Sequence, residues 1–315
     1  MTVHRKNAEQ ADSATPSSGR KSRFRIPGRY LAVAPPYIWM VIFFLVPFLL
    51  ALKISLASPV FDQPPYTAVF EWTRGWLPEF KGTLDNYRFL TTDNLYILAY
   101  LNSIKIAVIS TVLCLLIGYP MAYGIARAPG TLRNVLLMGI ILPFWTSFLI
   151  RIYAWIGILK SEGVLNHVLM FLGIIDDPLP LIHNWFSLYV GIVYSYLPFM
   201  ILPLYANLAR MDESLLEAAS DLGCRPWKTF FSITVPLSFP GIVAGSMLVF
   251  IPCVGEYVIP VLLGGPDTLM IGPVLWNEFF QNVDWPVASA VAIAMLILLV
   301  IPIAIFQHYQ SREDA

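Results

Sequence analysis

The sequence predicts an all-α integral membrane protein with six transmembrane helices, and three observations support that prediction. Hydrophobic residues make up 57% of the 315 positions and charged residues only 13%, whereas a soluble chain carries roughly 25% charged residues. The mean hydropathy is +0.67. The apolar residues gather in runs of about 20 residues, the length that a helix needs to cross the hydrocarbon core of a bilayer.

Six apolar runs give the expected spans, and polar segments separate them. The transmembrane domain is expected over 30–308, with spans at about 31–56, 99–126, 135–158, 188–208, 240–263 and 287–306. A basic tail, 1–29, precedes this domain and is expected to be disordered, and a short tail, 309–315, follows it. The first run is too long for a signal peptide, so we expect an uncleaved span there.

The distribution of charge predicts which side of the membrane each loop faces. The two tails, the turn near Arg127 and the segment from Arg210 to Pro240 hold 13 Lys or Arg residues and 8 Asp or Glu residues. The loops on the other side hold 4 Lys or Arg residues and 11 Asp or Glu residues. Because loops rich in Lys and Arg stay in the cytoplasm, both termini are expected to be cytoplasmic.

Composition also argues against several classes of function. The formal net charge is zero, so nothing favours nucleic-acid binding. Cys114 and Cys253 lie in apolar runs and Cys224 in a loop expected to be cytoplasmic, so free thiols are expected rather than disulfides. None of the four histidines stands at metal-ligand spacing, and we expect no metal site. A membrane enzyme would need a constellation such as His-Glu-x-x-His, which the sequence lacks.

The segment 210–236, between the fourth and fifth spans, has the pattern of two short helices. Asp212 or Ser214 can cap the first helix, and Ser214 and Glu217 have the spacing of a capping box at its start. Gly223 suits the end of that helix, and Pro226 suits the first position of the second. This segment is expected to lie on the inner face of the membrane.

The same segment resembles the signature of the binding-protein-dependent, MetI-like permeases of ATP-binding-cassette importers. That signature is Glu-Ala-Ala, three residues, Gly, nine residues, then Ile-x-Leu-Pro. The sequence supplies it at the same spacing, with Val235 in place of the leucine, through Glu217, Ala218, Ala219, Gly223, Ile233 and Pro236. The resemblance implies that these residues, with Arg225, dock on a separate ATPase and pass its closure to the spans. The alternative is an ordinary surface helix.

The resemblance implies the rest of a machine in the bacterial inner membrane. The fold would be that of a type I importer permease, with coupling helices between spans four and five. The partners would be a homologous second permease, two copies of an ABC ATPase, a periplasmic polyamine-binding protein and the lipid bilayer. The sequence has no Gly-x-x-x-x-Gly-Lys-[Ser/Thr] phosphate loop. The chain is therefore expected to be non-catalytic and to bind no cofactor, with ATP and Mg²⁺ on the partner ATPase.

Further stretches resemble the polyamine branch of these permeases. Residues 142–155 are similar to the third span of the polyamine and iron branch, and 250–267 and 284–290 are similar to PotH-type putrescine permeases. The resemblance extends over about 34–306 and implies putrescine as the cargo. Spermidine, ferric iron or an anion are the alternatives. A secondary transporter is a different class, and it predicts inverted internal repeats, which the sequence lacks.

Putrescine has an ammonium group at each end of a slim chain, so its path needs carboxylates and aromatic faces. Glu256 is the one carboxylate within the expected spans, and Tyr257 follows it. Ionisable groups inside a membrane are candidates for function because they are costly to bury. The alternatives for Glu256 are an ion pair with Arg151 or Lys105, or a cap at a helix break near Pro252.

Four further residues are candidates for the path. They are Trp145, Tyr153, Trp276 and Asp267. The aromatic residues have an alternative role as anchors at the membrane interface. Asp267 lies in a loop expected to face outward, where it would receive cargo, dock the binding protein or simply contact solvent.

Overall fold

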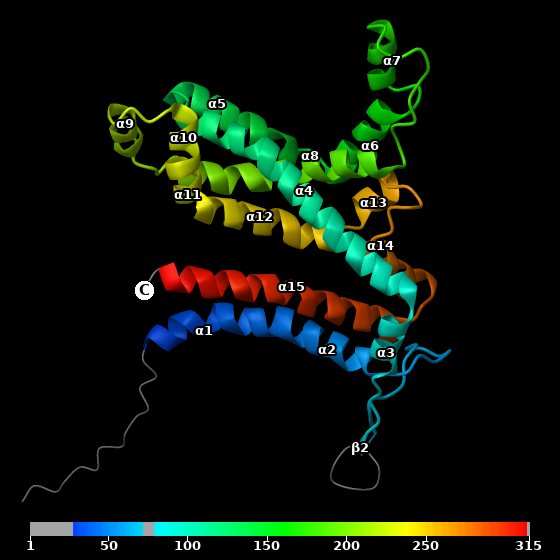
Figure 1. Ribbon diagram of the computed structural model, residues 1–315. Helices are drawn as coiled ribbons and strands as arrows, with labels where there is room; N and C mark the ends of the chain where they lie inside the picture. Colours follow the sequence, from blue (N-terminus) through cyan, green and yellow to red (C-terminus); the bar gives the residue numbers. More distant parts are fainter. Residues whose placement is uncertain (1–27, 72–78, 314–315) are drawn as a thin grey trace, which may run out of the picture. The chain divides into compact units, whose positions relative to one another are not determined.

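The computed structural model describes residues 28–71 and 79–313 of the chain (Figure 1). Residues 1–27 of the predicted N-terminal tail lie outside the described residues, and Gly28 and Arg29 already belong to helix α1. The chain forms two compact units, 1–48 and 49–315. The described part of the first unit holds α1 (Gly28–Met40), the π-helical η1 (Val41–Leu45) and the start of α2 (Val46–Ser55).

Three long helices form the core of the second unit. They are α4 (Asn94–Arg127), α8 (Trp185–Leu208) and α12 (Phe239–Val254), which pack against one another (Figure 1). Two clusters of buried apolar side chains lie among them, one centred on Ile106 and Ile192 and the other on Met200 and Leu204. Helix α8 stays continuous through two internal prolines.

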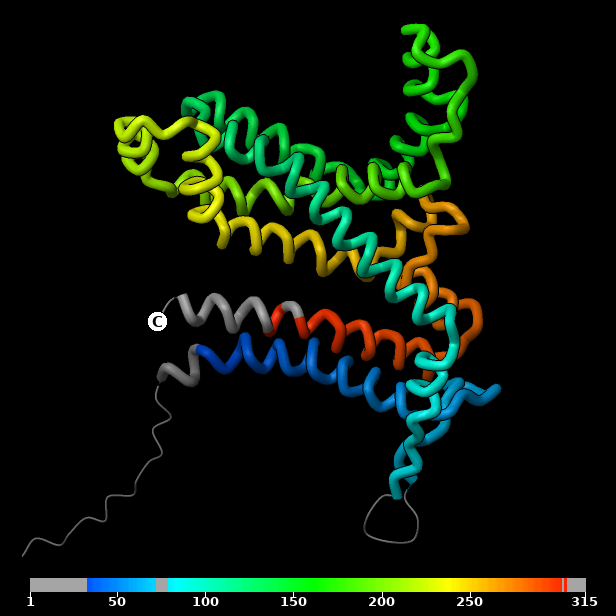
Figure 2. The backbone as a smooth tube through the Cα atoms, in the orientation of Figure 1, coloured from blue at the N-terminus to red at the C-terminus, as the bar shows by residue number. Residues whose placement is uncertain are grey.

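The run predicted as one span over 135–158 is broken in the structure. Helix α5 (Gly130–Ile141) continues into a 3-10 turn, η2 (Leu142–Trp145), and α6 (Phe148–Leu159) then starts in a new direction (Figure 2). The two helical pieces, Gly130–Trp145 and Phe148–Phe171, are bent by 96°. Proline at position 143 has no N–H to donate, and the hydroxyl of Thr146 donates to the Pro143 carbonyl at 2.7 Å. Thr146 itself is extended, which ends the helix there.

The run predicted over 240–263 is also divided. Helix α12 ends at Val254, and α13 (Val258–Leu263) begins after a break of three residues. The break begins at Gly255 and not at Pro252, which is inside α12. Before α12, the segment Pro226–Leu237 meets Phe239–Val254 at a bend of 65°.

The remaining elements pack around the ends of these helices. α3 (Asp85–Thr92), α14 (Ile271–Trp276) and α15 (Trp285–Glu313) share a third buried cluster with α4. The π-helical η4 (Asn277–Gln281) joins α14 to the turn before α15, and α7 (Val164–Phe171) follows α6. A short antiparallel pair, β1 (Phe70–Glu71) and β2 (Glu79–Phe80), extends from the loop after α2.

The length and apolar composition of the helices determine how many of them are candidate membrane spans. Among the described residues, three helices are long and apolar enough to cross a membrane: Val33–Ser55, α4 and α8. The number rises to five if each bent pair forms one span, and the apolar described part of α15, Trp285–Ile301, is shorter. Six spans therefore remain a prediction. Because α15 runs to Glu313, residues 309–313 of the predicted C-terminal tail are helical.

Candidate functional site

The segment between α8 and α12 contains the two short helices that the sequence predicts. They are α9 (Ser214–Asp221) and α10 (Pro226–Thr229), labelled in Figure 1. Gly223 ends the first with φ at 73°, in the left-handed region that glycine adopts without strain. The predicted capping box is wrong, because no side chain caps α9. Instead Asp212 Oδ1 accepts a hydrogen bond from the Ser214 N–H at 3.0 Å, and this bond lowers the pKa of Asp212.

The residues of the Glu-Ala-Ala signature are mostly on the surface. Glu217, Ala218, Gly223, Arg225 and Pro236 are exposed, Ile233 is half-buried and Ala219 is buried. Large apolar side chains are exposed beside them: Leu215, Leu222, Trp227 and Phe231. We call residues 210–236 the α9–α10 segment. Its exposed apolar face is the kind of surface by which proteins bind other proteins.

An ion pair that no sequence pattern indicates links the α9–α10 segment to α4. Arg127, the last residue of α4, donates from Nη1 to Glu213 Oε1 at 2.6 Å across 86 positions. Its guanidinium also lies 5.5 Å from the centre of the Tyr123 ring. Arg127 ends α4, and Glu213 precedes α9 far along the sequence, so no local pattern predicts their contact.

Glu256 lies in the break between α12 and α13, and its side chain is 9% exposed. Its Oε1 accepts hydrogen bonds from the backbone N–H groups of Val258 at 3.0 Å and Ile259 at 3.4 Å. Its Oε2 accepts a hydrogen bond from the hydroxyl of Tyr196 on α8. The carboxylate thus caps the first turn of α13. The sequence did not point to Tyr196, although a tyrosine in an apolar helix usually needs a partner for its hydroxyl.

The two cations considered as partners of Glu256 have other neighbours. The Arg151 guanidinium carbon lies 4.9 Å from the centre of the Phe144 ring, and Lys105 Nζ lies 5.6 Å from the centre of the Trp185 ring. Neither forms an ion pair with Glu256 in the part of the chain that the structure describes. Of the alternatives weighed for Glu256, the helix cap is therefore the arrangement observed.

Aromatic rings stack beside the Glu256 break. Tyr257 stacks on Trp276 with ring centres 4.6 Å apart, and Trp276 packs on Phe280 at 4.1 Å. These distances leave no room for a cation between the rings. Phe280 is a further aromatic residue of this stack, and the sequence did not indicate it.

The other predicted path residues are not drawn into this stack. Trp145 at the end of η2 and Tyr153 on α6 are exposed, and no ring contact of the described residues joins them to Tyr257 or Trp276. Asp267 is exposed in the turn between α13 and α14. The structure thus brings together Glu256, Tyr257 and Trp276 as neighbours along and beside one break.

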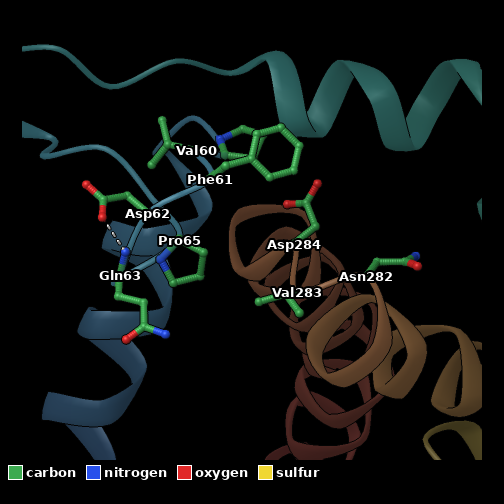
Figure 3. A pocket seen from close by; sticks show the side chains of 9 residues that line it. Val60, Phe61, Asp62, Gln63, Pro65, Asn282, Val283 and Asp284 are labelled. Atoms are coloured by element: carbon green, nitrogen blue, oxygen red, sulfur yellow. Dashed lines mark hydrogen bonds between the residues drawn. The ribbon is translucent and has the colours of Figure 1, made fainter.

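A cleft of about 660 Å³ lies between the loop after α2 and the turn before α15 (Figure 3). Its walls are residues 59–63 and 65 on one side and 282–284 on the other, so Asp62 and Asp284 come from opposite walls. Asp284 Oδ1 accepts a hydrogen bond from the Val287 N–H at the start of α15. Partial burial raises the pKa of Asp284.

Metal ligation has no candidate in the described ranges. Neither 28–71 nor 79–313 holds a group of three or more His, Cys, Asp or Glu side chains that could bind a metal ion.

The chain is similar to known transport proteins over most of its length. A family model described as "Binding-protein-dependent transport system inner membrane component" matches residues 114–313. The spermidine/putrescine transport system permease protein PotB of Haemophilus influenzae is 37% identical over 283 residues, which cover 90% of this chain and 93% of the relative. PotB of Escherichia coli K12 is 42% identical over 217 residues, covering 69% and 78%.

Solved structures share the fold. The bacterial alginate ABC transporter in complex with alginate pentasaccharide-bound periplasmic protein matches with a TM-score of 0.64 at 19% identity. The match covers 90% of this chain and 94% of that chain. At this identity the likeness speaks for the fold alone.

Proposed function

Because the chain belongs to the family of binding-protein-dependent transport system inner membrane components, we propose that it is the permease subunit of an ATP-driven polyamine importer. In this role the chain does not hydrolyse ATP itself. The ATPase is a separate partner present in two copies, and it binds ATP and Mg²⁺. A homologous second permease and a periplasmic polyamine-binding protein complete the assembly. Both termini face the cytoplasm.

The observation that carries this proposal is the exposed α9–α10 segment. It presents a charged and apolar surface that the chain itself leaves uncovered, with Glu217 and Arg225 beside Leu222 and Trp227. A protein partner is the occupant that such a surface suits. A secondary transporter would have no use for a segment that docks on an ATPase.

Polyamine is the cargo that the relatives and the chemistry favour together. The relatives named above are spermidine/putrescine permeases, and the loops expected to face outward are rich in carboxylates. We propose Glu256 as an electrostatic contact for a passing amine, with the stacked pair Tyr257 and Trp276 lining the path beside it. Trp145, Tyr153 and Asp267 remain further candidates along the path. Putrescine alone, as in PotH-type permeases, is the finer proposal, and spermidine fits the relatives equally well.

The test is ATP hydrolysis by the complete complex reconstituted in lipid. Hydrolysis is measured with binding protein that is empty or loaded with putrescine, spermidine, ferric iron or an anion. We expect stimulation by a polyamine, and we expect Glu217→Arg to abolish it. Stimulation by ferric iron or an anion alone would support the role as an importer and would refute polyamine as its cargo. A chain that neither assembles with an ATPase nor stimulates one would refute the proposal.

A further inference from the structure

The α9–α10 segment is joined to the helix core by its two chain connections and by Phe230, whose ring packs on Tyr119 and Tyr123 of α4. The chain enters α9 from α8 through residues 209–213 and leaves it through Gly223 into α10, and α9 itself packs mainly against α10. The ion pair between Arg127 and Glu213 is a separate route, because it connects the start of α9 to the end of α4. Movement of α9 can therefore reach α4 without passing through α8 or α10.

The position of each partner suits a link between two rigid helices. Arg127 is the last residue of α4, where the helix dipole favours a cation, and Glu213 precedes α9, where the dipole favours an anion. Arg127 is held on the α4 side. Its side chain is 24% exposed against 69% for Glu213, and it lies over the Tyr123 ring one turn earlier.

Helix α4, which carries Arg127, lies at the centre of the helix core. α4 packs against both α8 and α12, and it also contacts α14, which carries Trp276. A displacement at the Arg127 end of α4 is therefore applied to the helices that surround the Glu256 break. The pair itself is half-exposed, and exposed ion pairs contribute little to folding.

We propose that Arg127 and Glu213 form a positioning pair that transmits movement of the α9–α10 segment to α4, so that transport stays coupled to ATP hydrolysis. This inference rests on the proposed function, because the movement is the one that the ATPase imposes on the segment. The pair acts through its opposite charges. It is not required for the chain to fold or to assemble.

The experiment compares single charge reversals with the exchange of both charges in the complete reconstituted complex. The variants are Arg127→Glu, Glu213→Arg and the double exchange, and the readout is cargo transported per ATP hydrolysed. We expect each single reversal to assemble and to lower this ratio about fivefold, the factor that an exposed ion pair can supply. The double exchange is expected to restore the ratio, because it rebuilds the pair with its charges reversed.

A second ion pair among the described residues provides a matched control. Lys81 Nζ lies 2.5 Å from Glu71 Oε2 in the loop after α2, with both side chains about half exposed. Glu71→Gln breaks that pair, which has no place in the proposed link, and should leave the ratio unchanged. Glu213→Gln is the milder variant if a reversal fails to assemble, and it is expected to lower the ratio as well.

Two results would overturn the inference while leaving the importer intact. One is a wild-type ratio in Glu213→Gln or in both assembled reversals. The other is a double exchange that stays as uncoupled as the single reversals, since charge pairing would then not be the cause. Absence of polyamine-stimulated hydrolysis in the wild-type complex would instead refute the proposed function, and the inference would fall with it.

Discussion

Replacing Glu256 by glutamine tests whether a carboxylate in the α12–α13 break acts on a cationic cargo. The substitution removes the charge and keeps the shape of the side chain. The amide oxygen can still accept from the Val258 and Ile259 N–H groups, and the amide NH₂ can donate to the Tyr196 oxygen. Glu256→Gln is therefore expected to assemble normally.

The expected loss of uptake follows from the strength of hydrogen bonds to charged groups. Such a bond contributes about 1.5–3 kcal/mol, whereas a bond between neutral groups contributes about 0.5–1.5 kcal/mol. The difference, about 1.3 kcal/mol, corresponds to nearly a tenfold change in rate. We expect Glu256→Gln to lower polyamine uptake by about that factor when cargo is limiting.

The assay is uptake of labelled putrescine or spermidine into proteoliposomes that hold the complete complex. Tyr196→Phe is the matched control, because it removes one hydrogen bond to Glu256 and keeps the carboxylate. It is expected to cost about 1.5–3 kcal/mol of stability, because the lost bond is made to a charged group, and to cost little uptake. Uptake at the wild-type rate by assembled Glu256→Gln would refute the reasoning. An equal loss in Tyr196→Phe would show that the cap geometry matters and the charge does not.

Three further predictions concern stability, each measured as the thermal unfolding midpoint in detergent. Gly272→Ala is expected to destabilise by about 1–3 kcal/mol, because a Cβ would lie 2.4 Å from the Glu256 backbone oxygen; Gly139→Ala, which meets open space, should not lower the midpoint. Trp276→Leu removes ring contacts on two sides and should cost about 1–2 kcal/mol; an unchanged midpoint would contradict this. Burial raises the pKa of Asp284 in the folded protein. The contribution of Asp284 to stability is therefore complete below the pKa that it has in the unfolded chain, and it is lost as the pH rises through its pKa in the folded protein. The unfolding midpoint of Asp284→Asn should not show this decrease with rising pH. Identical dependence of the midpoint on pH in the variant and the wild type would contradict the prediction.

The sequence predicts the helices of this fold better than their directions. Each of the six apolar runs falls mostly on helical residues, because a long run of apolar residues indicates a segment that is surrounded by lipid or by other apolar helices. Hydropathy is summed over a window, so it does not register a change of direction within an apolar run. The bend at Thr146 and the break at residues 255–257 both lie inside such runs. Pro143 and Gly255 mark these places, but prolines inside α8 leave that helix unbroken.

The candidate site was predictable where its residues are neighbours in the sequence. Gly223 and Pro226 end and begin helices as expected, since each acts on its own backbone. The capping box failed because Asp212, two residues before Ser214, accepts a hydrogen bond from the Ser214 N–H instead. Contacts such as Arg127 with Glu213 depend on how separate helices pack, and no sequence spacing encodes them.

The structural and the proposed cargo roles of Glu256 are compatible in their use of lone pairs. Helix α13 packs in an apolar cluster in which Ile259 and Leu263 are fully buried, so the N–H groups of its first turn need an acceptor within the protein. Glu256 meets that need with Oε1, which accepts two hydrogen bonds, while Oε2 accepts one. An ionised carboxylate has about four acceptor sites, so one remains on Oε2 beside the Tyr196 hydroxyl. An ammonium group can use that site without displacing the cap, which is why Glu256→Gln is expected to lower uptake before it lowers stability.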